Sequence, residues 1–221
     1  MFSYEKDLPH ERGNTMTQKV IVHVARDHGS KGSVIAEKLA EVLNCKVYDD
    51  SIIDDIAKQH DLDPEVLKNY DEKPRRSILY RLSQGGGSDL PEKMMQYMFE
   101  YFQHIADTED RAVIVGRCAG EALENVDYNV NVFVTAKTGF RIKNVMEAFD
   151  LSFEEAERRI AEVDKARERF HETYSRSRWQ TFENYDLIVN TTEIGIDGAV
   201  KMILEYLELR FPEAPAEEPQ D

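Results

Sequence analysis

The chain has little cysteine and no long run of apolar residues. Of its 221 residues only Cys45 and Cys118 are cysteines. Two cysteines so far apart form no metal-binding spacing, and they predict a reduced, cytoplasmic protein rather than a disulfide-rich secreted one. A membrane-spanning helix needs ~20 consecutive apolar residues, and the first 18 residues are polar. The sequence therefore predicts neither a membrane partner nor a signal segment.

Positive charge is also scarce. The 28 Lys and Arg residues face 43 Asp and Glu residues, so the formal net charge is −15. A field of this sign repels polyanions, which argues against polymeric nucleic acid or an anionic membrane as a partner. A local basic pocket for a small anion stays compatible with this balance. The length suits a single α/β domain, or a domain with a mobile sub-domain.

Short apolar runs alternate with helical patterns between a flexible extension at 1–18 and an acidic, Pro-rich, disordered tail at 212–221. The strands that we expect lie at about 19–24, 46–48, 112–115, 129–134 and 187–190. The helices lie at 32–43, from near 50, within 64–90, from near 91, and at 138–149, 152–172 and 196–210. This alternation predicts an α/β fold with a parallel sheet, in which ligands bind beyond the carboxyl ends of the strands.

The first candidate site is the turn Gly29-Ser30-Lys31-Gly32-Ser33, between the first strand and the first helix. Backbone N–H groups from His28 to Gly32, the helix dipole and the Lys31 charge could hold phosphate, and the Ser33 hydroxyl could bind Mg²⁺. The match to G-x-x-x-x-G-K-[ST] is imperfect, because Ala25 and Ser30 replace glycines and Gly32 separates Lys31 from Ser33. An ordinary turn with a solvated Lys31 stays open as the alternative.

Two further segments follow strand ends. Asp49-Asp50-Ser51 follows the second strand, where it could border an acceptor site, help to organise a metal, or simply cap the next helix. Gly116-Arg117 follows the third strand, and an arginine there points into the ligand crevice and can fork onto a phosphate. The alternative is a surface arginine at a turn.

The segment 140–179 is rich in arginine although the chain as a whole is acidic. Its arginines are Arg141, Arg158, Arg159, Arg167, Arg169, Arg176 and Arg178. Asp164 and Arg167 lie at i, i+3 on one helix face. Such a segment could cover a polyphosphate and exclude water, and the alternative is a solvated face of ion pairs. We expect Trp179 to pack in the interior, and the Met-rich helix 94–102 to be core or an interface, which leaves a homodimer open.

Taken in order, these segments resemble the cytidylate kinase-like family of P-loop kinases. The resemblance runs from about Lys19 to Leu209. It rests on HVARDHGSKGSVIAEKLA, VYDDSII, NYDEKP, VIVGRCAG, VFVTAKTGFRIKNVM, IAEVDKARERFHETYSRSRW and YDLIVNTTEIGIDGAV. It implies a three-layer α/β/α P-loop kinase fold with a five-stranded parallel sheet, in one domain at 19–211. The acceptor region then falls at about 50–110 and a helical, Arg-rich lid at about 150–180.

The resemblance also implies roles for individual residues. ATP and Mg²⁺ are the implied cofactors, and small-molecule nucleotides are the implied partners. The implied donor-site residues are His28, Gly29, Ser30, Lys31, Gly32, Ser33 and Arg141, with Lys31, Arg158 and Arg159 as the catalytic cations and Ser33 on the metal. The implied acceptor-site residues are Asp50, Ser51, Arg117, Asp164 and Arg167.

The implied function is a nucleoside monophosphate kinase that transfers the ATP γ-phosphoryl group to CMP or dCMP. The chain departs from true cytidylate kinases at Ala25, His28 and Ser30, where side chains replace glycines, and at Cys118, which replaces an aspartate. Another small-molecule kinase on the same fold and a non-catalytic nucleotide-binding protein therefore stay open as alternatives.

Overall fold

The structure is a computed structural model, and it describes residues 18–49, 51–60, 90–116, 118–175 and 178–212. Several expectations lie outside the described residues. They concern the flexible extension before residue 18, most of the acidic tail, the region 64–89, Asp50 and Arg117.

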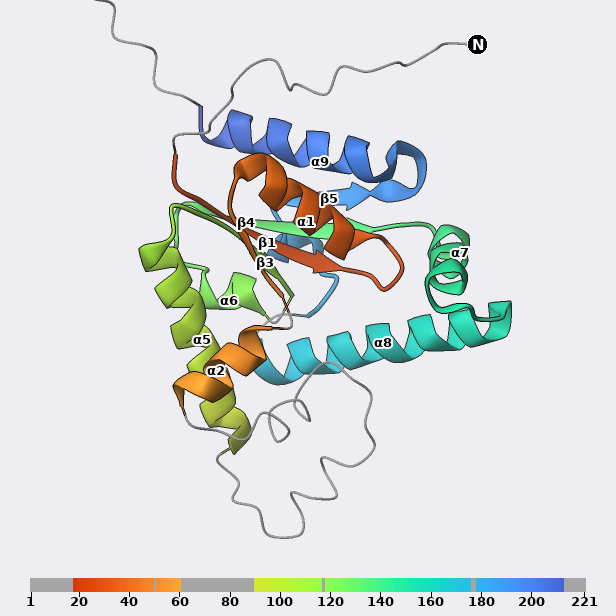
Figure 1. Cartoon of the computed structure of the whole chain (residues 1–221), viewed down its shortest axis with the longest axis horizontal. Helices are drawn as coiled ribbons and strands as arrows, with labels where there is room; N and C mark the ends of the chain where they lie inside the picture. The colour runs from red at the N-terminus through yellow and green to blue at the C-terminus, as the bar shows by residue number, and fades with distance from the viewer. Residues whose placement is uncertain (1–17, 50, 61–89, 117, 176–177, 213–221) are drawn as a thin grey trace, which may run out of the picture.

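A five-stranded sheet forms the centre of the fold (Figure 1). Its strands are β1 (Val20–Arg26), β2 (Lys46–Tyr48), β3 (Arg111–Val115), β4 (Asn129–Thr135) and β5 (Leu187–Asn190). They run in the order β2-β3-β1-β4-β5, and every neighbouring pair is parallel. The five apolar runs of the sequence are these strands, so the predicted parallel sheet is confirmed.

Helices cover both faces of the sheet (Figure 1). On one face α1 (Gly32–Leu43) and α9 (Thr191–Arg210) share a core with Val20, Val22 and Val24 of β1. On the other face α2 (Ile52–Gln59), α5 (Leu90–Thr108) and α6 (Ala119–Ala122) pack around Ile21. The alternation of side chains along a strand sends successive residues of β1 to opposite faces. The three-layer α/β/α fold is therefore as expected.

Two helices lie at the carboxyl end of the sheet. α7 (Thr138–Phe149) and α8 (Phe153–Tyr174) pack together through a small apolar cluster of Ile142, Val145, Ala156 and Ile160. Ser152 and Glu155 form the capping box that the sequence predicts at the start of α8. A 3₁₀ turn, η1 (Phe182–Asn184), follows α8 and leads into β5. Figure 1 shows α8 running below the sheet from α7 towards α2.

The last helix begins earlier than we expected. We predicted a start at 196, but α9 begins at Thr191, because the Asn190 side chain accepts a hydrogen bond from the Thr192 N–H. The two parts of α9 meet at a kink at Gly195, whose φ is 65°. The Met-rich helix contributes to the core, since Met95 and Met98 are buried. In the described part of the chain, no helix is long and apolar enough to cross a membrane.

Candidate functional site

The turn between β1 and α1 is fixed through its carbonyl groups. Three consecutive carbonyl oxygens each accept a hydrogen bond from a side chain of α7 or α9. The pairs are Arg141 Nε to His28 O at 2.7 Å, Asn144 Nδ2 to Gly29 O at 2.8 Å, and Thr191 Oγ1 to Ser30 O at 3.0 Å. The loop therefore takes its shape from segments more than 100 residues away in the sequence.

The N–H groups of the same loop have few partners. The Ser30 N–H donates to the Asp27 carbonyl at 3.3 Å, and the His28 N–H donates to Asp164 Oδ1 at 2.8 Å. The N–H groups of Gly29 and of residues 31–34 make no hydrogen bond to the described part of the chain. They include the first turn of α1, where the helix dipole adds positive potential. A row of unpaired N–H groups at a helix start suits an anion.

Lys31 and Ser33 flank this row. Lys31 is the N-cap residue of α1 with φ 69°, and its side chain makes no hydrogen bond or ion pair to the described residues. Ser33 is exposed in the first turn of α1. No group of three or more His, Cys, Asp or Glu side chains that could hold a metal occurs among the described residues. The exposed Ser33 hydroxyl nevertheless fits Mg²⁺, which commonly takes few protein ligands together with substrate phosphates.

Buried charges lie beneath the loop. The guanidinium of Arg141 pairs with Asp164 and lies 3.6 Å from Asp27. Asp27 also accepts hydrogen bonds from Thr135 Oγ1 at 2.6 Å and Gln180 Nε2 at 2.8 Å. Asp27 is 5% exposed, and our sequence reasoning did not select it. Its partners come from β4, α7 and the segment after α8, so no local pattern pointed to them.

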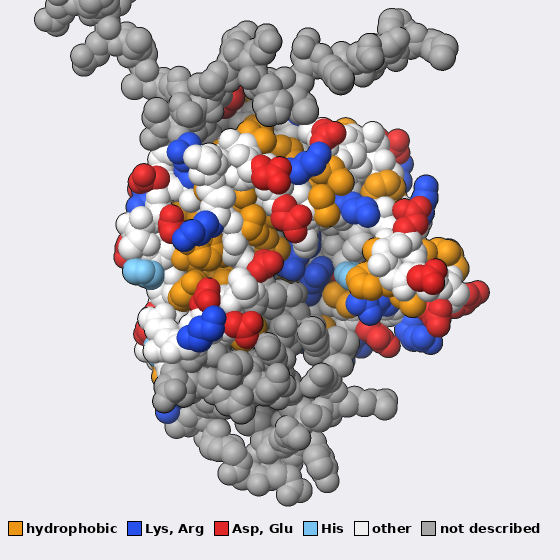
Figure 2. Space-filling view, viewed as in Figure 1, with side chains coloured by type: hydrophobic (Ala, Val, Ile, Leu, Met, Phe, Trp, Pro, Cys, Tyr) orange, Lys and Arg blue, Asp and Glu red, His pale blue; other side chains and the backbone are white. Residues whose placement is uncertain are grey.

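Several arginines surround His28. Burial, together with the charges of Arg167, Arg159, Arg141 and Arg26, lowers the pKa of His28 to about 4. Arg159 also lies over the Phe149 ring, with its guanidinium carbon 4.0 Å from the ring centroid. Arg158 is exposed, and its side chain makes no contact of this kind within the described residues. Figure 2 shows Lys or Arg and His side chains together in a hollow between the main body and the α7 lobe.

Comparison with known proteins identifies the family of this chain. No curated protein matches the chain significantly. A model of the cytidylate kinase-like family matches residues 21–193, which is most of the chain. The chain belongs to the cytidylate kinase-like family. The resemblance drawn from the sequence motifs is thereby confirmed.

Solved structures of similar fold exist. An uncharacterized protein from Eubacterium ventriosum is 25% identical, with 86% of this chain and 99% of that chain covered and a TM-score of 0.68. TT1252 from Thermus thermophilus is 15% identical, with 89% and 100% covered and a TM-score of 0.51. A shikimate kinase from Acinetobacter baumannii is 12% identical, with 89% and 97% covered and a TM-score of 0.49. Membership of this family supports a small-molecule kinase of the P-loop type.

In this cytidylate kinase-like chain, the Asp-x-x-Arg pair of α8 faces the loop. Asp164 binds the His28 N–H, and Arg167 donates to the Arg26 carbonyl at 2.9 Å. Ser51, in contrast, is exposed at the start of α2, where its N–H donates to Asp49 Oδ1 at 3.0 Å. Asp49 therefore closes a local turn before α2, and the N-cap residue Ser51 makes no side-chain capping hydrogen bond.

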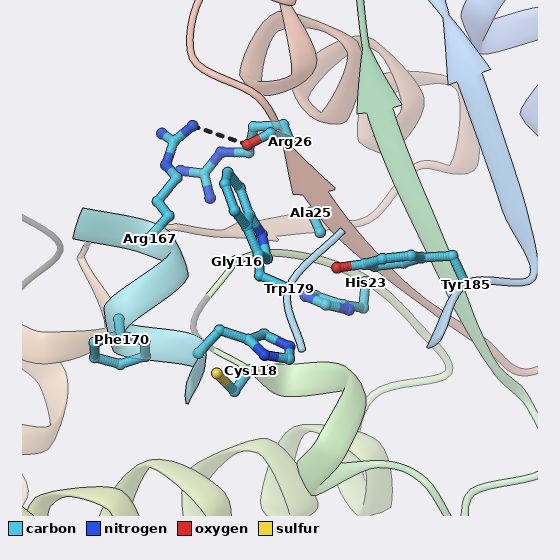
Figure 3. Close-up of a pocket in the computed structure, with 10 residues that line it drawn as sticks. His23, Ala25, Arg26, Gly116, Cys118, Arg167, Phe170, Trp179 and Tyr185 are labelled. Atoms are coloured by element: carbon cyan, nitrogen blue, oxygen red, sulfur yellow. Dashed lines mark hydrogen bonds between the residues drawn. The ribbon is translucent and has the colours of Figure 1, made fainter. Parts of the chain in front are cut away.

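A small pocket lies beside Arg167 (Figure 3). Its volume is about 20 Å³, enough for about one water molecule. Figure 3 shows Trp179 between the arginine side chains and Tyr185. Trp179 packs edge-on against Phe133, with 5.8 Å between the ring centroids, as expected for an interior residue. The lining residues are His23, Ala25, Arg26, Gly116, Cys118, Arg167, Phe170, His171, Trp179 and Tyr185.

His23 is one of the buried polar side chains of this pocket, together with Arg26. It is 5% exposed, and its Nδ1 lies 3.1 Å from Asn131 Oδ1. Burial lowers the pKa of His23 to about 4, although the hydrogen bond with Asn131 and the Gly116 backbone act in the opposite direction. The imidazole is therefore neutral at physiological pH.

Proposed function

We propose that this chain is an ATP:nucleoside monophosphate phosphotransferase with CMP or dCMP as its acceptor. The observation that carries the proposal is the loop itself. Its carbonyls are held by Arg141, Asn144 and Thr191, and its N–H groups around Lys31 are unpaired within the described chain. Membership of the cytidylate kinase-like family supports the same reading.

The donor phosphates would bind at the start of α1. The N–H groups of Gly29 and residues 31–33 and the Lys31 ammonium would contact their oxygens, and Arg141, Arg159 and Arg167 would add positive charge. Mg²⁺, when bound, would neutralise phosphate charge, with Ser33 as its protein ligand. An acceptor monophosphate oxygen is already anionic, so the reaction needs positioning and charge stabilisation rather than a strong general base.

The acceptor would lie opposite the donor. The family resemblance assigns Asp50, Ser51 and Arg117 to it, together with Asp164 and Arg167. Arg167 lines the small pocket of Figure 3, and this position beside the loop is compatible with that assignment. The contact of Asp164 with the loop marks a departure from a purely acceptor-binding role.

One observation favours a second candidate, a non-catalytic nucleotide-binding protein. The glycines of the cytidylate kinase loop are replaced here at Ala25, His28 and Ser30, and a carboxylate, Asp164, binds the loop N–H of His28. Both features would leave less space for a phosphate at the loop backbone, although the Lys31 charge is retained.

An ADP-release assay separates these functions. ATP and Mg²⁺ are supplied with CMP, dCMP, UMP, AMP or GMP, and with Lys31→Ala protein as the control. We expect ADP release that depends on CMP or dCMP and is lost in the variant. Release with UMP, AMP or GMP instead would keep the nucleoside monophosphate kinase and refute CMP or dCMP as its acceptor. Tight ATP binding without release for any acceptor would favour the non-catalytic protein.

A further inference from the structure

One carboxylate of α8 lies at the loop where an anion is expected to bind. Asp164 Oδ1 accepts the His28 N–H at 2.8 Å, and Oδ2 pairs with the Arg141 guanidinium. A loop N–H beside a guanidinium is a common pair of donors for phosphate oxygens. Asp164 therefore already supplies a negative oxygen to donors that would suit the substrate.

Taken together, the surroundings of Asp164 disfavour the charged form of its carboxyl group. Burial raises the pKa of Asp164, and the Asp27 carboxylate acts in the same direction. The His28 N–H and Arg141 act in the opposite direction, but the pKa still lies above its usual value. A raised pKa means that the charged form is less favourable here than in water. Release of Asp164 from the loop is therefore assisted by solvation of its charge.

The same turn of α8 makes a second contact with the loop region. Arg167, three residues beyond Asp164, donates to the Arg26 carbonyl at 2.9 Å. Nearer its start, α8 packs on α7 through the small apolar cluster that contains Ala156 and Ile160. Because Asp164 and Arg167 lie on one helix face, movement of Asp164 away from His28 also changes the position of Arg167.

We propose that Asp164 is an internal competitor of the donor phosphate for the His28 N–H and the Arg141 guanidinium. The His28 N–H is a single donor, so a donor phosphate that takes it displaces Asp164 and shifts this turn of α8. Donor binding is thereby coupled to the position of Arg167. The inference rests on the proposed donor site and deepens it, because it gives Asp164 the role of a competing ligand.

Asp164→Asn and Asp164→Ala test the proposal, with Glu162→Gln as the matched control. Glu162 is exposed on the same helix, so its variant removes an equal charge without touching the loop. Thermal melts establish that each variant is folded. Titration calorimetry then measures binding of ATP with Mg²⁺ and of inorganic tripolyphosphate. We expect Asp164→Ala to tighten both by about tenfold, Asp164→Asn to tighten them less, and the control to match the wild type.

Unchanged or weaker binding in both Asp164 variants would overturn the competitor role. Hydrogen exchange gives a second readout, since the His28 amide should exchange faster in Asp164→Ala than in the wild type without nucleotide. An unchanged rate would also count against the proposal. Tighter tripolyphosphate binding without ADP release for any acceptor would support the competitor and refute the kinase. If no variant bound ATP or tripolyphosphate, both proposals would fail.

Discussion

The guanidinium of Arg141 lies 3.6 Å from the carboxylate of Asp27, and both side chains are buried beneath the loop. The same guanidinium pairs with Asp164 and donates to the His28 carbonyl. One cation thus joins two acidic side chains and the backbone of the candidate phosphate loop. The stability of this end of the protein and the shape of the loop therefore depend on the same residue.

Replacing Arg141 by methionine should lower the free energy of unfolding by about 3 kcal/mol, because the buried Asp27 and the half-buried Asp164 would then lose their cation. Arg141→Lys should lower the free energy of unfolding by less than Arg141→Met does. It keeps the charge, but an ammonium cannot fork to both carboxylates. Urea unfolding measures each effect. The control is Lys143→Met on the same helix, whose ammonium is exposed and should matter by less than ~0.5 kcal/mol. Equal losses in Arg141→Met and Lys143→Met would contradict the expectation.

Lys31 should matter for turnover and not for folding. Removing one preorganised cation at a phosphate should cost about 10²–10³ in turnover. The φ of 69° allows a matched pair, because Lys31→Gly relieves the left-handed strain and Lys31→Ala retains about 1 kcal/mol of it. Both variants should lose activity equally, while Lys31→Gly melts at or above the wild-type temperature. Lys38→Ala, on the exposed side of α1, should stay active. Full turnover in either Lys31 variant would refute the proposed mechanism.

Two glycines near the loop should respond in opposite directions to alanine. Gly29 has a φ of +81°, and a Cβ there would lie 2.7 Å from the Arg141 carbonyl oxygen. Gly29→Ala should therefore destabilise the protein by at least about 1–2 kcal/mol and disturb the loop. Gly139 in α7 has open space around its Cβ direction, so Gly139→Ala should stabilise by up to about 1 kcal/mol. Denaturant unfolding compares them, and a shift of the same sign in both would argue against this loop geometry.

His23 should make the protein less stable in acid. Its pKa is lowered from 6.5 to about 4 in the fold, so the unfolded chain takes up the proton first as the pH falls. The free energy of unfolding should then fall by about 3 kcal/mol between pH 6.5 and pH 4 through this residue, and level off below pH 4. The difference between wild type and His23→Gln across this window isolates the effect. His104→Gln, exposed on α5, should leave the pH profile unchanged; a His23→Gln profile parallel to the wild type would refute the assignment.

Regular elements were predictable because their signals are local. The apolar runs at 112–115 and 187–190 and the capping box at Ser152 and Glu155 each lie within a few residues, and the structure confirms them. The environment of Asp27 was not predictable. Its partners Thr135 and Gln180 lie 108 and 153 residues away, and nothing near Asp27 in the sequence indicates that the fold brings them together.

The positions of Arg158 and Arg159 were only partly predictable from the sequence. The resemblance implied both Arg158 and Arg159 at the donor phosphates, yet successive residues of a helix point about 100° apart. Ala156 and Ile160 are buried against α7, and Asp164 and Arg167 continue the same stripe. Arg159 lies beside that stripe and near His28, whereas Arg158 is exposed. The helical period therefore separates the two residues in position, while their roles at the donor phosphates stay predictions.

Because the His28, Gly29 and Ser30 carbonyls are anchored by other helices, the loop loses its conformational entropy during folding rather than during ligand binding. Side chains of α7 and α9 order these residues as the chain folds, so a ligand meets a loop whose backbone freedom has already been removed. Glycine is still needed at two loop positions: Gly29, where φ is positive, and Gly32, where a Cβ would lie 2.5 Å from the Arg26 Cβ. A short peptide carrying only β1, the loop and α1 would lack these anchors, and its affinity for an anion should be correspondingly weak.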